Sequence, residues 1–329
     1  MILIIGSNSF SGSSFIDYLL KKKNKVIGVS RSKELDKIYL PYKKNTFQKK
    51  NFKFYKADLN KNNDLKKIIN IIKKNKIKYI VNFAAQGMVA ESWIKPQDWY
   101  QTNVLSNSKL INMLSKININ KYLNFSTPEV YGNTTHLIKE NFNFNPSTPY
   151  AISRACQDMN LLAYSKFYNL PVVFTRTANI FGPSQQLYRI IPKAIICAKK
   201  KINLKLHGGG SSIRSFIFME DVNKALYKIL FDKNNTGETF HISTNKFISI
   251  KELVFKIFEK LNSNKNLIKI SDERKGKDYG YFLNSKKLRK VYRWHNEYKL
   301  DDGINETINW VEKNYNILKN ESIEYKHKS

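Results

Sequence analysis

The chain has 329 residues, enough for one large core or for two domains that share an interface. Its formal net charge is +31, but lysines accompany Asn and Ile throughout and no nucleic-acid-binding motif occurs, so we expect an anionic small-molecule substrate and no nucleic-acid partner. Two cysteines are too few for a disulfide framework or a cysteine metal cluster, which favours the cytoplasm. No apolar run reaches membrane-spanning length, so we expect no membrane partner.

Short apolar runs alternate with helical patterns over the first 180 residues. The segments at 13–22 and 64–74 carry apolar residues at helical spacing, and longer helices are predicted near 98–117 and 149–168. This alternation predicts an α/β fold with a parallel sheet covered by helices on both faces. The predicted strands lie at 1–6, 25–30, 52–59, 78–85, 121–127 and 171–180.

The pattern loosens after Asn179 into loops and short helices, including the stretch 207–216. A further strand is predicted at 236–243, and helices at 249–261 and 301–315. We interpret this region as a smaller lobe on the first, with the chain passing between the two. The polar tail at 318–329 is the candidate for disorder, chiefly after Asn320.

The sequence IIGSNSFSG places Gly6, Ser9 and Gly12 between the first strand and the first helix. Gly6 permits a tight turn, Gly12 permits close packing of helix on sheet, and the backbone N–H groups at the helix start can hold a pyrophosphate. The pattern therefore predicts a dinucleotide site. The alternative is a plain strand-to-helix turn.

The ends of the second and third strands predict the cofactor type. Ser30 and Arg31 stand where NAD-preferring folds usually carry a carboxylate, and Arg31 suits a 2′-phosphate, which favours NADP. Asp58 could accept a hydrogen bond from the adenine amino group. Alternatively, Arg31 is a solvated surface residue and Asp58 caps the next helix.

Tyr150 and Arg154 stand four residues apart in the predicted helix at 149–168, so one helical turn stacks their side chains. A short-chain dehydrogenase pairs its catalytic Tyr with a Lys at this spacing. A cation about 4 Å from the phenol lowers the pKa of Tyr by about 3 units, and Arg carries the same charge as Lys. The pair predicts a proton-transfer site, the alternative being an inert helical Tyr beside a surface Arg.

With this pair, the chain resembles the extended short-chain dehydrogenase/reductase family, and more narrowly the nucleotide-sugar 4,6-dehydratases of the GDP-mannose and dTDP-glucose types. The resemblance implies a Rossmann doubly wound parallel sheet with a smaller C-terminal substrate lobe. The matching blocks occur in the family's order at 6–12, 82–93, 126–132, 149–155, 176–183, 213–222 and 284–294.

The resemblance implies that Tyr150 removes the proton of the sugar O4 while the C4 hydride passes to the cofactor, with Thr127 bonded near O4. Glu129 matches the base that removes the C5 proton before water leaves C6. Pro128 stands where one dehydratase branch has a proton-donating Asp, so Glu129 would pass its proton to the leaving oxygen. Arg154 completes the catalytic set.

The resemblance also implies two sets of binding residues. NAD(P), with NADP favoured, would contact Gly6, Ser9, Phe10, Gly12, Ser30, Arg31, Asp58, Leu59, Ala84, Ala85, Tyr150 and Arg154. The nucleotide-diphosphate sugar would contact Asn179, Arg189, Lys193, Arg214 and Arg274; alternatively, these cations are ordinary surface charges.

The domain boundaries follow from the same resemblance. Residues 1–178, with the chain returning at about 215–247, would form the NAD(P)-binding domain. Residues 179–214 and 248–317 would form the nucleotide-sugar lobe. A homodimer would assemble through the helices near 98–117 and 149–168.

Four other functions stay open. A 4-epimerase of this fold normally lacks a carboxylate at the position of Glu129, whereas sugar-acid decarboxylases carry one. A non-catalytic sensor of dinucleotide or sugar nucleotide would fit Arg154 and Pro128, but not the retained Tyr150 and Glu129. RNA binding would rest on the net charge alone.

Overall fold

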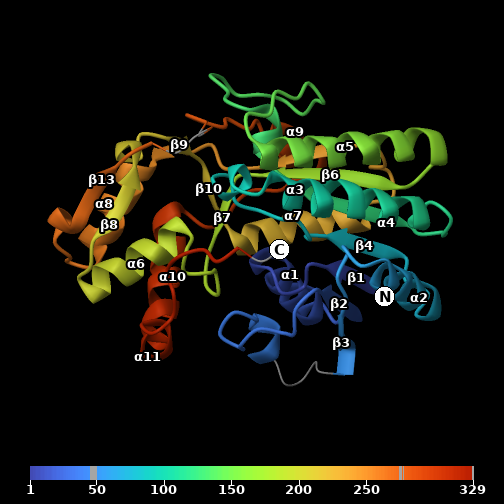
Figure 1. The fold of residues 1–329 in the computed structure, drawn as a ribbon, viewed down its shortest axis with the longest axis horizontal. Helices are drawn as coiled ribbons and strands as arrows, with labels where there is room; N and C mark the ends of the chain where they lie inside the picture. Colours follow the sequence, from blue (N-terminus) through green and yellow to red (C-terminus); the bar gives the residue numbers. More distant parts are fainter. Residues whose placement is uncertain (45–49, 274–275, 277, 328–329) are drawn as a thin grey trace.

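The computed structural model describes residues 1–44, 50–273, 276 and 278–327. At its centre lies a seven-stranded parallel sheet in the order β11-β6-β5-β4-β1-β2-β3 (Figure 1). The order reverses at β1, so the predicted doubly wound sheet is confirmed. The strands are β1 (Ile2–Ile5), β2 (Val26–Ser30), β3 (Phe52–Lys56), β4 (Tyr79–Asn82), β5 (Lys121–Ser126), β6 (Val172–Thr177) and β11 (Thr239–Ile242).

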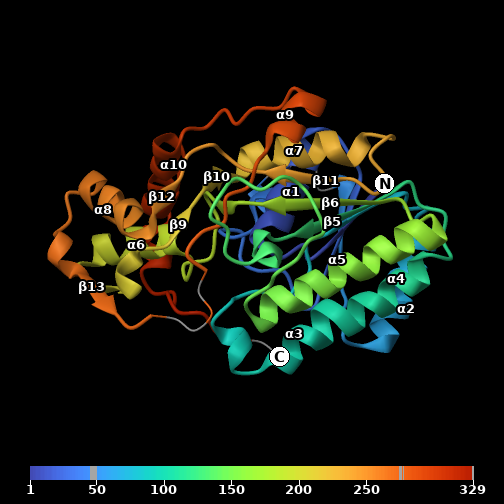
Figure 2. The ribbon, with the colours of Figure 1, turned by 90° about the horizontal axis from the view of Figure 1, so that it is seen from above.

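Helices cover both faces of the sheet because its strands are apolar on both sides (Figure 2). In β1, Ile2 and Ile4 belong to one hydrophobic core while Leu3 and Ile5 belong to the other, as the two-residue period of a strand requires. The first core includes α1 (Phe10–Lys21), α7 (Met219–Phe231) and α9 (Lys286–Tyr292), and the second includes α2 (Asn62–Lys74), α4 (Asn107–Leu114) and α5 (Pro149–Tyr168).

The two long helices predicted near 98–117 and 149–168 are present and lie side by side (Figure 2). The first is a continuous run of α3 (Pro96–Tyr100), the π-helical η4 (Gln101–Ser106) and α4. The second is α5, which begins where the Thr148 hydroxyl accepts a hydrogen bond from the Ala151 N–H and Pro149 occupies the first turn. This start fixes the position of Tyr150 one residue into the helix.

A second group of elements packs around its own hydrophobic core beside the sheet (Figure 1). Its helices are α6 (Ile190–Lys200), α8 (Ile250–Lys260), α10 (Leu300–Lys313) and α11 (Tyr315–Leu318). Its strand pairs are β7 (Asn179–Phe181) with β10 (Phe216–Phe218), β8 (Leu204–His207) with β13 (Ile268–Ser271), and β9 (Ile213–Arg214) with β12 (Ile248–Ser249). Short 3₁₀ turns are η1 (Pro41–Lys44), η3 (Glu91–Trp93), η5 (Pro128–Tyr131), η6 (Gly208–Gly210) and η7 (Lys265–Leu267).

Two expectations for the C-terminal part were wrong. The stretch 207–216, expected as loop or short helix, also forms β9 and supplies the ends of β8 and β10. The tail after Asn320 is not disordered up to His327: Ile323 packs on the core of the smaller lobe and the His327 ring stacks on Trp99. No helix in the described part of the chain is long and apolar enough to cross a bilayer.

Candidate active site

A cleft of about 1100 Å³ opens at the carboxyl ends of the sheet strands and runs between the sheet and the smaller lobe. In doubly wound folds, ligands bind at this edge of the sheet. A second cavity of about 150 Å³ adjoins it at the ends of β2 and β3. The larger cleft exceeds the usual volume of a small-molecule site, so it can hold two ligands together.

The turn between β1 and α1 has the shape that a dinucleotide requires. Gly6 has a φ of +86°, and a Cβ placed on it would lie 2.7 Å from the Ala84 backbone N. A Cβ on Gly12 would lie 2.3 Å from the Gly6 carbonyl oxygen. The Ser9 hydroxyl caps α1 by accepting from the Gly12 N–H and donating to Gly6 O. The free N–H groups of this helix start fit a pyrophosphate.

The smaller cavity has the position and lining of an adenosine pocket. Ser30, Arg31, Asp58, Leu59, Ala84 and Ala85 line it, and Phe10 lines the main cleft. Asp58 Oδ1 accepts a hydrogen bond from the Asn60 N–H, so this carboxylate also organises its own turn. The predicted cofactor residues therefore line these two adjoining cavities, except Gly12, which lines neither.

Tyr150 and Arg154 both face the main cleft from the first turns of α5. Arg154 is only 3% exposed, its Nη2 donates to the Phe125 carbonyl, and its Nε has no hydrogen-bond partner among the described residues. A buried guanidinium N–H without a partner suits a polar ligand in the cleft. Burial excludes the alternative of a surface Arg at this position.

The pKa of Tyr150 is raised above 10.0, chiefly by burial and then by the nearby charge of Glu129. Arg154, the hydrogen bond from Thr127 and the charge of Arg189 act in the opposite direction. Arg154 thus has the predicted effect on the phenol, but the predicted net lowering was wrong because desolvation outweighs it.

Glu129 lies beside Tyr150 on η5, the short turn that follows β5. The turn begins at Thr127, whose hydroxyl accepts from the Glu129 N–H at 3.5 Å, and Pro128 occupies its first position. Burial raises the pKa of Glu129 above 4.5, against the lowering effect of Arg214. Its Oε2 is buried without a hydrogen-bond partner in the described structure. A buried carboxyl of this kind in a cleft is suited to proton transfer.

A buried network beneath η5 holds this turn in place. Tyr131 at the end of η5 is hydrogen-bonded to His241 Nε2 at 2.8 Å and to Arg176. Arg176 also forms a fully buried ion pair with Asp158 at 3.1 Å. Burial and the charge of Arg176 lower the pKa of His241 to about 3, so the ring is neutral and can serve as the hydrogen-bond acceptor.

The predicted substrate residues lie at the other end of the cleft. Asn179, Arg189, Lys193 and Arg214 all line it, whereas Arg274 lies outside the described residues. The Arg214 guanidinium donates to the carbonyls of Ile213, Asp278 and Tyr279 and covers the Tyr281 ring at 4.3 Å. Arg214 is thus held in place by three backbone carbonyls.

Three groups in the cleft were missed by the sequence analysis. Asp278 and Tyr281 line it, and burial raises the pKa of Asp278, whose Oδ2 accepts from the Ser147 hydroxyl at 3.0 Å. The third is the tail segment 323–326. The motif DYGY offered a signal for the first two, because charged and aromatic residues cluster there, but the polar tail offered none.

The sequence matches a family model described as GDP-mannose 4,6 dehydratase over residues 3–307. The chain is 27% identical to the dTDP-D-glucose 4,6-dehydratase of Mus musculus, over 97% of this chain and 90% of that protein. It is 30% identical to a trifunctional UDP-glucose 4,6-dehydratase/UDP-4-keto-6-deoxy-D-glucose 3,5-epimerase/UDP-4-keto-L-rhamnose-reductase of Arabidopsis thaliana, over 95% of this chain. It spans only 47% of the length of that plant relative.

Solved structures of dTDP-glucose 4,6-dehydratases are also similar to this chain. The dTDP-glucose 4,6-dehydratase of Bacillus anthracis in complex with NAD has a TM-score of 0.84 and 29% identity, over 96% of this chain and 97% of that one. A Streptomyces venezuelae dTDP-glucose 4,6-dehydratase with NAD bound has a TM-score of 0.88 at 24% identity, over 96% and 98%, and supports the fold. The match over nearly the whole chain shows that this protein belongs to the GDP-mannose 4,6 dehydratase family.

Proposed function

We propose that the protein is an NAD(P)-dependent nucleotide-sugar 4,6-dehydratase, which forms a 4-keto-6-deoxy sugar. The observation that carries this proposal is the pairing of Tyr150 with Glu129 in one cleft. The unpartnered Glu129 oxygen provides a base for C5 that an epimerase of this fold does not need. Dehydratases from mouse and Bacillus anthracis align over nearly the whole chain, which supports the same reaction.

The catalytic side chains divide the proton transfers between them in this proposal. A bound nicotinamide would supply the acceptor and later the donor of the sugar's hydride. Thr127 and Arg154 stabilise the phenolate form of Tyr150, whose Oη takes the O4 proton and becomes the neutral phenol. Glu129 takes the C5 proton made acidic by the 4-keto group, and it returns a proton to the departing C6 oxygen because Pro128 has none to give.

The glycine turn and the smaller cavity would hold the cofactor. Gly6, Ser9 and Gly12 would hold the pyrophosphate, and Ser30 and Arg31 the adenosine ribose. We propose a preference for NADP, because the residues directly after β2, Arg31 to Lys33, include no carboxylate and Arg31 lines both cavities. The neighbouring structures were solved with NAD, so the nicotinamide dinucleotide class has independent support.

Replacing Arg31 by Ala tests this preference. We expect the affinity for NADP to fall by about tenfold, because a charge-assisted bond to a phosphate contributes on the order of 1.5 kcal/mol, while the affinity for NAD changes little. Titration of both dinucleotides by isothermal calorimetry measures the effect. Equal losses for NAD and NADP would contradict a 2′-phosphate contact.

The smaller lobe would bind the nucleotide sugar through cations that face its diphosphate. We propose residues 179–214 and 248–317 as this lobe, and residues 1–178 with 215–247 as the cofactor domain. Asn179, Arg189, Lys193 and Arg214 stand in the cleft for this role, and the proposed set includes Arg274. Arg214 is the strongest anchor for the diphosphate since its position is fixed by three carbonyls.

We also propose a cytoplasmic homodimer that pairs through α5 and the helical run ending in α4. Large apolar side chains on these helices face solvent, at Leu105, Ile152, Met159 and Phe167. Such a face is typical of a subunit interface. Both Cys156 and Cys197 are free thiols, which is consistent with a reducing compartment.

Replacing Met159 by Glu tests the dimer, because Met159 is 58% exposed at the middle of α5. A charge buried on both sides of a two-fold interface should shift the protein to monomers. Analytical ultracentrifugation of the variant and the unaltered protein measures the change. A monomeric mass for the unaltered protein would contradict the proposal.

The proposed reaction is tested with GDP-, dTDP-, UDP- and CDP-hexoses, each incubated with the protein and NAD or NADP. Mass spectrometry should show the loss of one water from one of these sugars. A changed sugar without water loss would indicate a 4-epimerase, and loss of CO₂ from a uronic acid would indicate a decarboxylase. Tight binding without conversion of any sugar would indicate a sensor.

A further inference from the structure

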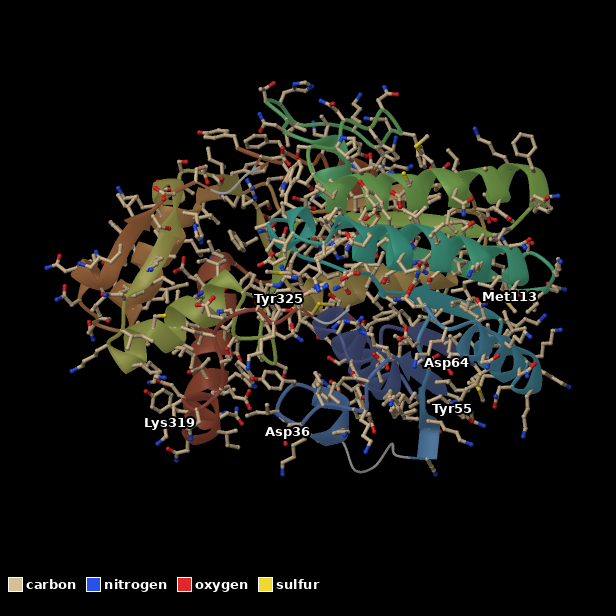
Figure 3. All side chains as sticks on the ribbon, viewed as in Figure 1. Asp36, Tyr55, Asp64, Met113, Lys319 and Tyr325 are labelled. Atoms are coloured by element: carbon tan, nitrogen blue, oxygen red, sulfur yellow. The ribbon has the colours of Figure 1, made fainter. Side chains whose placement is uncertain are left out.

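The segment Ser322–His327, which we name the strap, crosses the cleft from one side to the other. Ile323 packs on the core of the smaller lobe, and residues 323–326 line the cleft. Figure 3 shows Tyr325 near the middle of the molecule, whereas Lys319, just after α11, lies at its outer edge. The chain thus turns back after α11 and enters the site.

The strap is attached on both sides of the cleft. On the lobe side, the Lys193 ammonium and the Glu324 carboxylate form an ion pair at 2.7 Å. On the sheet side, His327 Nε2 lies 2.6 Å from Asp98 Oδ2, and the His327 ring is parallel to Trp99 with centroids 4.9 Å apart. These contacts connect α6 to α3 through a segment whose residues 323–326 line the cleft.

The middle of the strap lies among the cations proposed for ligand binding. The Tyr325 ring meets the Tyr188 ring edge-on at 5.1 Å, and both Arg31 and Arg189 are close enough to lower the pKa of Tyr325 against the larger effect of burial. Arg31 belongs to the proposed cofactor site and Arg189 to the proposed substrate site. The strap therefore passes between the two ligand positions.

The Glu324 carboxylate is paired with the Lys193 ammonium, a cation that we propose binds the substrate. Lys193 is a proposed ligand of the sugar-nucleotide diphosphate, and an ammonium paired with a carboxylate at 2.7 Å has less charge to offer a phosphate. The Glu324 side chain is 72% exposed, so its ion pair is weak and can open at small cost. A diphosphate, with a higher charge, can displace it.

We propose that the strap is an intramolecular competitor of the substrate: Glu324 occupies the diphosphate position on Lys193, and binding of the nucleotide sugar expels the strap. This inference rests on the proposed function and adds to it a regulation of the same site. If the site is open for only a fraction of the time, the apparent dissociation constant rises by the inverse of that fraction. Loosening the strap should therefore tighten binding.

The test compares Glu324→Gln with Glu321→Gln, a matched loss of charge on an exposed residue just before the strap. GDP, UDP and dTDP are titrated into the full chain with its cofactor, without turnover. Glu324→Gln should bind the preferred diphosphate about two- to fivefold more tightly, and Glu321→Gln should bind it as the unaltered protein does. His327→Ala, which releases the other attachment, should tighten binding as well.

Hydrogen exchange gives an independent measurement of the strap itself. Amides at 322–327 should exchange faster when the diphosphate is bound, since the segment is expelled. Weaker binding in Glu324→Gln, or slower exchange with ligand, would overturn the inference and make the strap a closing lid. Unchanged affinity in both Glu324→Gln and His327→Ala would also overturn it.

These outcomes separate the strap from the proposed reaction. Tighter diphosphate binding in Glu324→Gln, without water loss from any sugar, would contradict the proposed dehydratase reaction and support the proposal that the strap competes with the substrate. Water loss from a sugar, with unchanged diphosphate binding in the strap variants, would support the dehydratase reaction and contradict competition by the strap. Failure of every nucleoside diphosphate to bind would contradict both proposals.

Discussion

Replacing Tyr150 by Phe is expected to lower kcat by about 10²–10⁴-fold, because the reaction then lacks the group that takes the O4 proton. Phe keeps the volume of the ring, so the melting temperature and cofactor affinity should change little. The rate of 4-keto-sugar formation measures the effect. The matched control is Tyr168→Phe at the far end of α5, where the ring is 63% exposed and removal of its hydroxyl should leave kcat unchanged.

The pH dependence of kcat tests the same group. Tyr150 must lose its proton to act, so the rate should rise with pH through a pKa that burial and Glu129 raise and Arg154 lowers. In Arg154→Met that pKa should move further up, and the rising limb of the profile should move to higher pH. Full activity in Tyr150→Phe, or an unmoved profile in Arg154→Met, would contradict the assigned roles.

Replacing Glu129 by Gln is expected to stop water loss and to stabilise the protein at neutral pH. Gln has almost the same shape but cannot take the C5 proton, so kcat should fall by about 10²–10⁴-fold. The buried Oε2 without a partner costs on the order of 1–3 kcal/mol when the group is charged. The melting temperature should therefore rise by roughly 1–2 °C per kcal/mol regained.

The sign of the pH effect follows from the pKa of Glu129, which is raised above 4.5 in the folded protein. Between pH 4.5 and the raised value, the folded chain holds a proton that the unfolded chain has lost, so stability falls as pH rises through this window. Well below pH 4.5 the carboxyl is neutral in both states. The melting temperatures of Glu129→Gln and of the unaltered protein should therefore converge there.

Glu140→Gln is the matched control for this variant. Burial also raises the pKa of Glu140, but its Oε1 accepts from the His241 N–H at 3.0 Å and it is not among the residues that line the cleft. Glu140→Gln should keep its catalytic rate. Equal losses of rate in the two variants would show that the turn is sensitive to any lost charge and would contradict a base at Glu129.

The fold was predictable because its signals are local. Strands such as β1 are short and apolar on both faces, and helices such as α2 carry their apolar residues at helical spacing, so neighbours along the chain suffice to recognise them. The start of α5 is fixed by its own first residues, Thr148 and Pro149. The smaller lobe was harder, because β9 and β12 have two residues each and form only when distant segments meet.

The proposed catalytic residues of the candidate site were predictable from the sequence, but the net direction of the Tyr150 pKa shift was not. Tyr150 and Glu129 are 21 positions apart, and only the turn after β5 and the start of α5 bring them into one cleft. Burial then reverses the expected direction of the Tyr150 pKa. Desolvation depends on everything packed around a group, so no local pattern reports it. The strap was missed because its attachments, Lys193 and Asp98, lie far away in the sequence.

The most direct test of the account is the reaction in D₂O with the sugar nucleotide that the panel identifies. We predict a product that has lost one water from the sugar and gained one deuterium at C5, because Glu129 gives up the original C5 proton and solvent replaces it. Glu129→Gln should give neither change. Water loss without deuterium at C5, or a C4 epimer without water loss, would contradict elimination by Glu129.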